Sequence, residues 1–83
     1  MDESLVLEIE EHLRRYLQAH PQAIDNERGI YEWWLRGASR SYPVTDVRDA
    51  IERLVATGEL IRLTLPDGGY TYASSASTRS RSP

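Results

Sequence analysis

The spacing of apolar residues changes from helical to strand-like in the last third of the chain. Over residues 44–55 apolar residues recur in steps of three and four, the spacing of one face of an α-helix. They are Val44, Val47, Ile51, Leu54 and Val55. Gly58 follows, and glycine often ends a helix because it accepts a left-handed backbone. From Ile61 the period is two, so the pattern predicts a helix over 45–57 and then a strand.

A turn and a second strand follow. Residues 66–69 read Pro-Asp-Gly-Gly, which are turn formers, and the next three residues, Tyr-Thr-Tyr, are strand formers. A four-residue loop pairs Leu65 with Tyr70 and Leu63 with Tyr72. This register predicts that all four side chains share one face of the hairpin.

Two more helices are predicted before this segment. Residues 3–20 carry an apolar stripe at helical spacing between charged residues. A second helix is predicted over 25–36, with Asp25 or Asn26 as its N-cap and Gly37 at its end. The first stripe consists of Leu5, Ile9, Leu13, Tyr16 and Leu17. The predicted buried core is Leu5, Ile9, Leu13, Leu17, Ile30, Trp34, Val47, Ile51, Leu54, Leu60 and Leu63.

Length and composition narrow the class of protein. A chain of 83 residues makes one domain, predicted over 1–73, and the serine- and arginine-rich residues 74–83 are expected to be a disordered tail. The absence of cysteine excludes disulfide frameworks, thiolate metal sites and thiol catalysis. No apolar run is long enough to cross a bilayer, and the acidic N-terminus does not resemble a signal peptide. We therefore expect a cytoplasmic protein with no membrane partner.

The residues that carry catalytic or metal chemistry do not form a recognisable motif. His12 and His20 are eight residues apart, with no other soft ligand nearby in the sequence. Gly68 and Gly69 belong to the predicted turn, and no helix follows them to hold a phosphate. We expect no enzymatic activity, no metal, no cofactor and no small-molecule substrate.

One segment resembles a known superfamily. Residues 47–61 read V-x-x-A-I-x-x-L-V-x-x-G-x-L-I, and with the predicted order of helices and hairpin they resemble the winged helix-turn-helix superfamily. The resemblance covers residues 3–73 and implies an α+β fold with three helices and a C-terminal two-stranded wing. In this superfamily the third helix enters the major groove and the wing rests on the DNA backbone. The resemblance thus implies a bacterial-type transcription regulator that contacts DNA through residues 45–56 and 62–71.

The charge pattern predicts that any binding to double-stranded DNA is weak. The net charge is −3, and residues 45–59 hold two arginines against four acidic side chains. Asp46 and Asp49 are predicted on the helix face that meets the groove. Phosphate contacts need clustered positive charge. The candidate DNA-binding residues are Arg36, Arg40, Thr45, Arg48, Arg53 and Arg62.

An unusually aromatic second helix supports an alternative function. Residues 30–35 read Ile-Tyr-Glu-Trp-Trp-Leu, which is more apolar than one core-facing stripe requires. Part of this run is explained if one tryptophan lies in the core and the other covers a seam between helices. The other reading is a protein-interaction surface at Tyr31, Trp33 and Leu35, because Trp, Tyr and Arg are enriched at interface hot spots. Its partner is another protein or a second copy, and the acidic face of the third helix is a second candidate docking surface.

Overall fold

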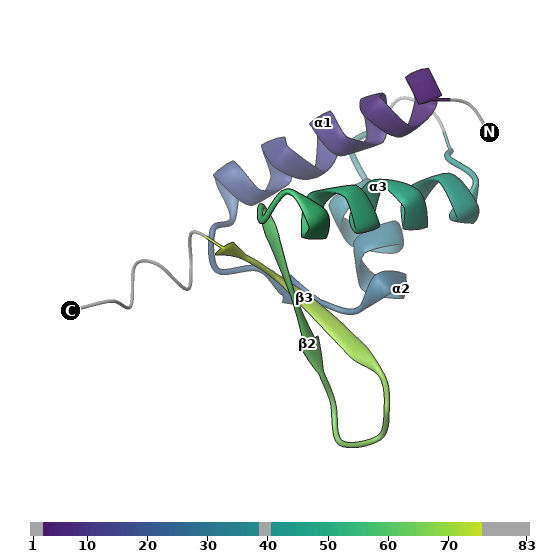
Figure 1. Cartoon of the computed structure of the whole chain (residues 1–83). Coiled ribbons are helices and arrows are strands. Elements are labelled where there is room, and N and C mark those ends of the chain that lie inside the picture. Colours follow the sequence, from purple (N-terminus) through teal and green to yellow (C-terminus); the bar gives the residue numbers. More distant parts are fainter. Residues whose placement is uncertain (1–2, 39–40, 76–83) are drawn as a thin grey trace.

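The computed structural model describes residues 3–38 and 41–75. The described elements are α1 (Glu3–Ala19), β1 (Ile24–Asp25), α2 (Glu27–Gly29), η1 (Ile30–Trp34), α3 (Val44–Ala56), β2 (Leu60–Thr64) and β3 (Tyr70–Ser74). Because η1 continues α2 directly, the described chain is an α+β fold with three helical segments and a three-stranded antiparallel sheet (Figure 1). The β2–β3 hairpin extends away from the helices (Figure 1).

Strand β3 lies between β1 and β2. The short strand β1 was not predicted; in it Ile24 pairs with Ala73 and Asp25 with Tyr72. Asp25 is therefore a strand residue, and the N-cap is Asn26, whose side chain accepts a 2.8 Å hydrogen bond from the Gly29 N–H.

The predicted tail begins before the last strand ends. Ser74 ends β3 and is buried, although it was expected to begin a disordered segment. The remainder of that segment, residues 76–83, lies outside the described residues.

The hairpin register differs from the predicted one by one residue. Thr64 pairs with Tyr70 and Arg62 pairs with Tyr72. The predicted pairs of Leu65 with Tyr70 and Leu63 with Tyr72 are therefore wrong. A shift of one residue moves side chains to the opposite face of a strand, so these leucines and tyrosines lie on opposite faces of the hairpin.

The loop explains this shift. It spans residues 65–69 and is closed by two backbone hydrogen bonds, from the Leu65 N–H to the Gly69 carbonyl at 2.8 Å and from the Gly68 N–H to the Leu65 carbonyl at 2.9 Å. Gly68 has φ 92°, a conformation that glycine adopts without steric cost. Because Leu65 is bonded to Gly69, the turn inside this loop holds three residues, 66–68, one fewer than the predicted four.

The core lies between α1, α3, η1 and the inner face of the sheet. Its buried members are Val6, Ile9, Leu13, Leu17, Ile30, Trp34, Leu35, Tyr42, Val47, Ala50, Ile51, Leu54, Leu60 and Tyr72. Nine of the eleven predicted core residues are among them. Leu63 is 42% exposed because of the register shift, and Leu5 is only partly buried because Val6 takes the central position on α1.

The second helix departs from α geometry, and this sets which aromatic side chain faces the solvent. Over Ile30–Trp34 the helix has π geometry, in which the hydrogen bond spans five residues and not four. The wider turn places residues four and five apart on one side. Accordingly Ile30, Trp34 and Leu35 are buried while Trp33 is 54% exposed. Leu35, which was predicted at an interface, therefore belongs to the core.

Candidate functional site

Two of the arginines predicted to hold DNA are paired with carboxylates of the same chain. Arg48 on α3 has its Nη2 2.9 Å from Glu27, and Arg53 has its Nη2 3.1 Å from Glu3. The hydrogen bond that Arg48 donates to Glu27 raises the pKa of Arg48, and the one that Arg53 donates to Glu3 raises the pKa of Arg53. These carboxylates occupy the donors that a phosphate would take.

Arg62 is held on the inner face of the hairpin. It forms an ion pair with Glu52 of α3. Its guanidinium carbon also lies 5.1 Å from the ring centre of Tyr70 and 5.6 Å from that of Tyr72. Cation–π contacts of this kind are attractive, and they restrain the arginine further. A phosphate would have to compete with all three partners.

Arg36 differs from these arginines. Among the described residues it has no carboxylate partner, and its guanidinium carbon lies 5.1 Å from the ring centre of Trp33. Both side chains are exposed. Sequence reasoning assigned them to different surfaces, one for DNA and one for protein, and the structure joins them into one patch, here called the Trp33–Arg36 patch.

The structure describes one of the two remaining DNA candidates. Thr45 is exposed in the first turn of α3, and Arg40 lies outside the described residues. Asp46 is only 9% exposed, so its predicted place on the groove-facing side is wrong. The buried face of α3 includes Ala50, one turn after Asp46, whereas Val44 is 48% exposed. The core face of the helix is therefore rotated toward Asp46.

Tyr31, the third predicted interface residue, is held in the fold. Its hydroxyl donates a 2.7 Å hydrogen bond to the carbonyl of Tyr42, and it is partly buried. Tyr42 is buried in turn, and its hydroxyl donates a 2.6 Å hydrogen bond to Glu8. These contacts connect η1 and α1 with the segment before α3. Tyr42 was not predicted in the core, although it is the single aromatic residue in a polar connection.

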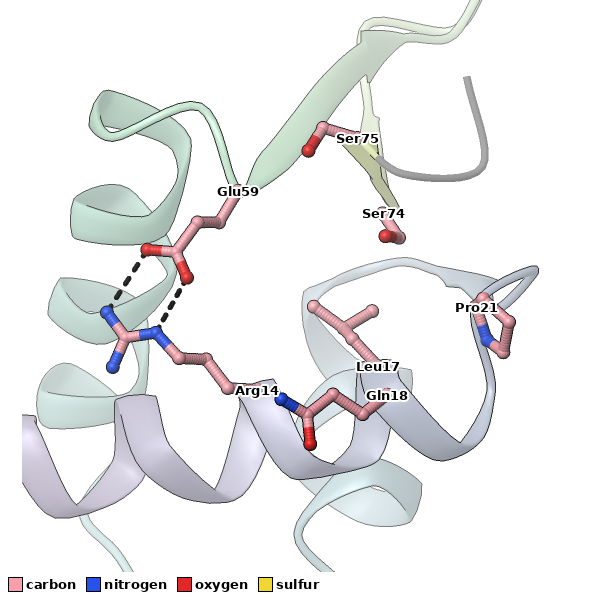
Figure 2. A pocket seen from close by; sticks show the side chains of 7 residues that line it. All are labelled: Arg14, Leu17, Gln18, Pro21, Glu59, Ser74 and Ser75. Atoms are coloured by element: carbon pink, nitrogen blue, oxygen red, sulfur yellow. Dashed lines mark hydrogen bonds and ion pairs between the residues drawn. The ribbon is translucent and has the colours of Figure 1, made fainter. Parts of the chain in front are cut away.

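A cavity of about 420 Å³ lies near the C-terminal end of α1. Its lining residues are Arg14, Leu17, Gln18, Pro21, Glu59, Ser74 and Ser75 (Figure 2). Arg14 donates two hydrogen bonds to Glu59, at 2.6 and 3.1 Å. The hydrogen bond with Glu59 raises the pKa of Arg14, and the bond with Arg14 lowers the pKa of Glu59. Both side chains therefore stay charged at neutral pH, and they act as a clamp between α1 and the start of β2.

Arg14 and Arg53 belong to one ion-pair network between α1 and α3. Glu10 is buried on α1, with its carboxylate 3.3 Å from Arg14 and 3.6 Å from Arg53. Glu3 and Glu59 pair with the outer sides of these two arginines. The network uses positive charge to join elements of the fold, so the same charge is not presented to a ligand.

In the described parts of the chain, no group of three or more His, Asp or Glu side chains is placed to hold a metal ion. None of the helices in residues 3–38 and 41–75 is long and apolar enough to span a membrane. Comparisons with protein-family models, curated proteins and solved structures gave no match to this chain.

Proposed function

We propose that this protein is a non-enzymatic winged-helix module that binds another protein through the Trp33–Arg36 patch. One observation carries the proposal: Trp33 is 54% exposed with Arg36 against its ring. The arginines on α3 and β2 that would hold a phosphate are instead paired with carboxylates. The order of helices and hairpin supports the winged-helix part of the proposal.

The chemistry of the patch indicates the kind of surface that it binds. Covering an exposed tryptophan removes a large apolar area from water, which is why tryptophan dominates many interfaces. Stacking on the indole holds the Arg36 guanidinium in place before a partner arrives, and this lowers the entropy cost of binding. Because no described carboxylate pairs with Arg36, the matching surface is an apolar pocket with an acidic residue at its rim.

The test uses four forms of the protein as bait and compares which proteins each form captures. The four forms are wild type, Trp33→Ala, Arg36→Ala and Leu7→Ala. Leu7 is 49% exposed on α1 and serves as the control for removing an exposed apolar side chain. A partner identified by its loss from the first two variants is then purified and titrated. We expect Trp33→Ala to weaken its binding at least about 30-fold, the effect of a hot-spot residue. Equal affinity for wild type and Trp33→Ala would contradict the proposal.

Binding to double-stranded DNA is the second candidate function. Two observations favour it: Arg36 has no carboxylate partner among the described residues, and Thr45 is exposed at the start of α3. On this interpretation the ion pairs of Arg48 and Arg62 lower the affinity for DNA. Binding should then fall steeply between about 50 and about 200 mM salt.

A pair of matched variants tests the DNA reading. Glu27→Gln with Glu52→Gln releases Arg48 and Arg62, and it should tighten duplex binding several-fold. The control is Glu11→Gln with Glu32→Gln, which removes the same charge from residues that do not pair with α3 or β2. If neither the wild type nor the first double variant binds duplex at low salt, the DNA function should be dropped.

A further inference from the structure

Strand β2 has an open edge in the described part of the chain, because β3 occupies the middle of the sheet. Two hydrogen bonds show which backbone groups face β3. The Leu65 N–H donates to the Gly69 carbonyl at the hairpin tip, and the Ser75 N–H donates to the Glu59 carbonyl at its base. Backbone groups alternate sides along a strand, so the N–H and C=O groups of Arg62 and Thr64 point to the open edge.

The outer face of the sheet is apolar beside this edge. Ile61 pairs with Ala73, which pairs with Ile24, so these three side chains share the face directed away from the helices. Leu63 lies on the same face and is 42% exposed, and Leu65 follows it at 38%. Ile61, Leu63 and Leu65 are here called the outer row. A sheet covered on one side normally presents polar residues on the other, so this row is unusual for a solvated surface.

We propose that β2 pairs with β2 of a second copy of this chain, antiparallel and about a two-fold axis at Leu63. In this register Leu63 lies opposite Leu63 of the second copy, and Ile61 lies opposite Leu65. Arg62 lies opposite Thr64, and their outward N–H and C=O groups bond across the new pair. The two outer rows then form one continuous apolar strip.

The backbone groups at the open edge and the charges near it favour β2 of a second copy as the pairing strand. An open edge of N–H and C=O groups binds an extended strand. An axis at Arg62 would place two guanidinium groups opposite each other, which is unfavourable. An axis at Ile61 would place the Glu59 carboxylate opposite Leu63. Among the residues paired in this register, 61–65, the axis at Leu63 opposes no like charges, and Arg62, the only charged residue in β2, is already balanced by Glu52.

The first test uses the absence of cysteine from the natural sequence. Directly opposed residues in an antiparallel pair have Cβ atoms about 4.5–5.5 Å apart, and a small shift permits a disulfide. Leu63→Cys should therefore form a covalent dimer in oxidised glutathione. Leu65→Cys is the control, because its two copies would be four residues apart along the strands, about 13 Å.

We expect covalent dimers of Leu63→Cys to form at least about tenfold faster than those of Leu65→Cys at equal protein concentration, on non-reducing gels. Both side chains are exposed to a similar degree, so random collisions affect the two variants alike. Similar rates, or a faster rate at position 65, would overturn the proposed register.

The second test exchanges charge at the axis and is read by sedimentation. Leu63→Lys and Leu63→Glu should each abolish self-association, because each opposes two like charges. An equimolar mixture of the two should associate again as a heterodimer. Leu7→Glu, on α1, is the control and should associate as the wild type does. A wild type that stays monomeric at millimolar concentration, or a mixture that fails to associate, would overturn the proposal.

Discussion

The adjacent residues Trp33 and Trp34 give the sharpest test of the fold around the proposed site. Trp34 is 4% exposed and stacks on Tyr16, with ring centres 5.0 Å apart and planes 13° from parallel. A tryptophan buries about 150–250 Å² when covered. At about 25 cal/mol per Å², this corresponds to roughly 4–6 kcal/mol as an upper limit. We expect Trp34→Ala to lower the free energy of unfolding by about 3–5 kcal/mol.

Trp33→Ala should cost far less, about 1 kcal/mol, because about half of that side chain is already in water and its contact with Arg36 is exposed. The assay is urea unfolding followed by far-ultraviolet circular dichroism. A chain of this length has a total stability of roughly 4–12 kcal/mol, so the two variants should be easily separated. Equal losses for the two variants would refute the placement of Trp34 in the core and Trp33 in the solvent.

Two further predictions concern Gly29 and Glu59. A Cβ atom on Gly29 would lie 1.8 Å from the Asp25 Oδ1, so Gly29→Ala should lower the free energy of unfolding by about 1–3 kcal/mol, whereas Gly37→Ala, with open space around it, should be near neutral in thermal melts. Because Arg14 lowers the pKa of Glu59, this carboxylate stabilises the fold above its unfolded pKa and loses that effect as pH falls through its folded pKa. Glu59→Gln should therefore reduce the loss of unfolding free energy below about pH 4. The reduction should be at most about 1 kcal/mol, because the pair is exposed. The same dependence of unfolding free energy on acid pH in the variant and the wild type, measured by urea unfolding, would contradict this.

The periodicity of the sequence was sufficient to predict the main elements but not their finer geometry. Ile51 and Leu54 on α3 and the end of the helix near Gly58 follow from the repeat alone. The π turn at Ile30–Trp34 does not, because hydrophobic spacing was interpreted with an α-helical period. A two-residue strand such as β1 is too short to show any period, and its pairing with β3 depends on the rest of the fold.

The sequence was sufficient to predict which residues are candidates for the site, but not which charged residues pair with one another. Exposure of Trp33 was expected from the excess of apolar residues in the second helix, and it is confirmed. The ion pairs of Arg48 and Arg53 join residues 21 and 50 positions apart. No local rule relates positions so distant in sequence. The contact of Arg36 with Trp33 is three residues apart, the spacing of neighbours on a helix surface, and this signal was available in the sequence.

The packing of α1 against α3 has a consequence for the order in which the chain acquires structure during synthesis. The apolar side of α1, with Val6, Ile9 and Leu13, is made first, while Ile51 and Leu54 of α3 are made about forty residues later. The ribosome therefore releases α1 with its apolar side uncovered. The last strand, β3, is made after both helices, and its end is joined to the base of β2 by the hydrogen bond from the Ser75 N–H to the Glu59 carbonyl. The sheet is thus completed only after β3 has been made, and a chain cut short before β3 leaves the inner face of β2 without its partner strand.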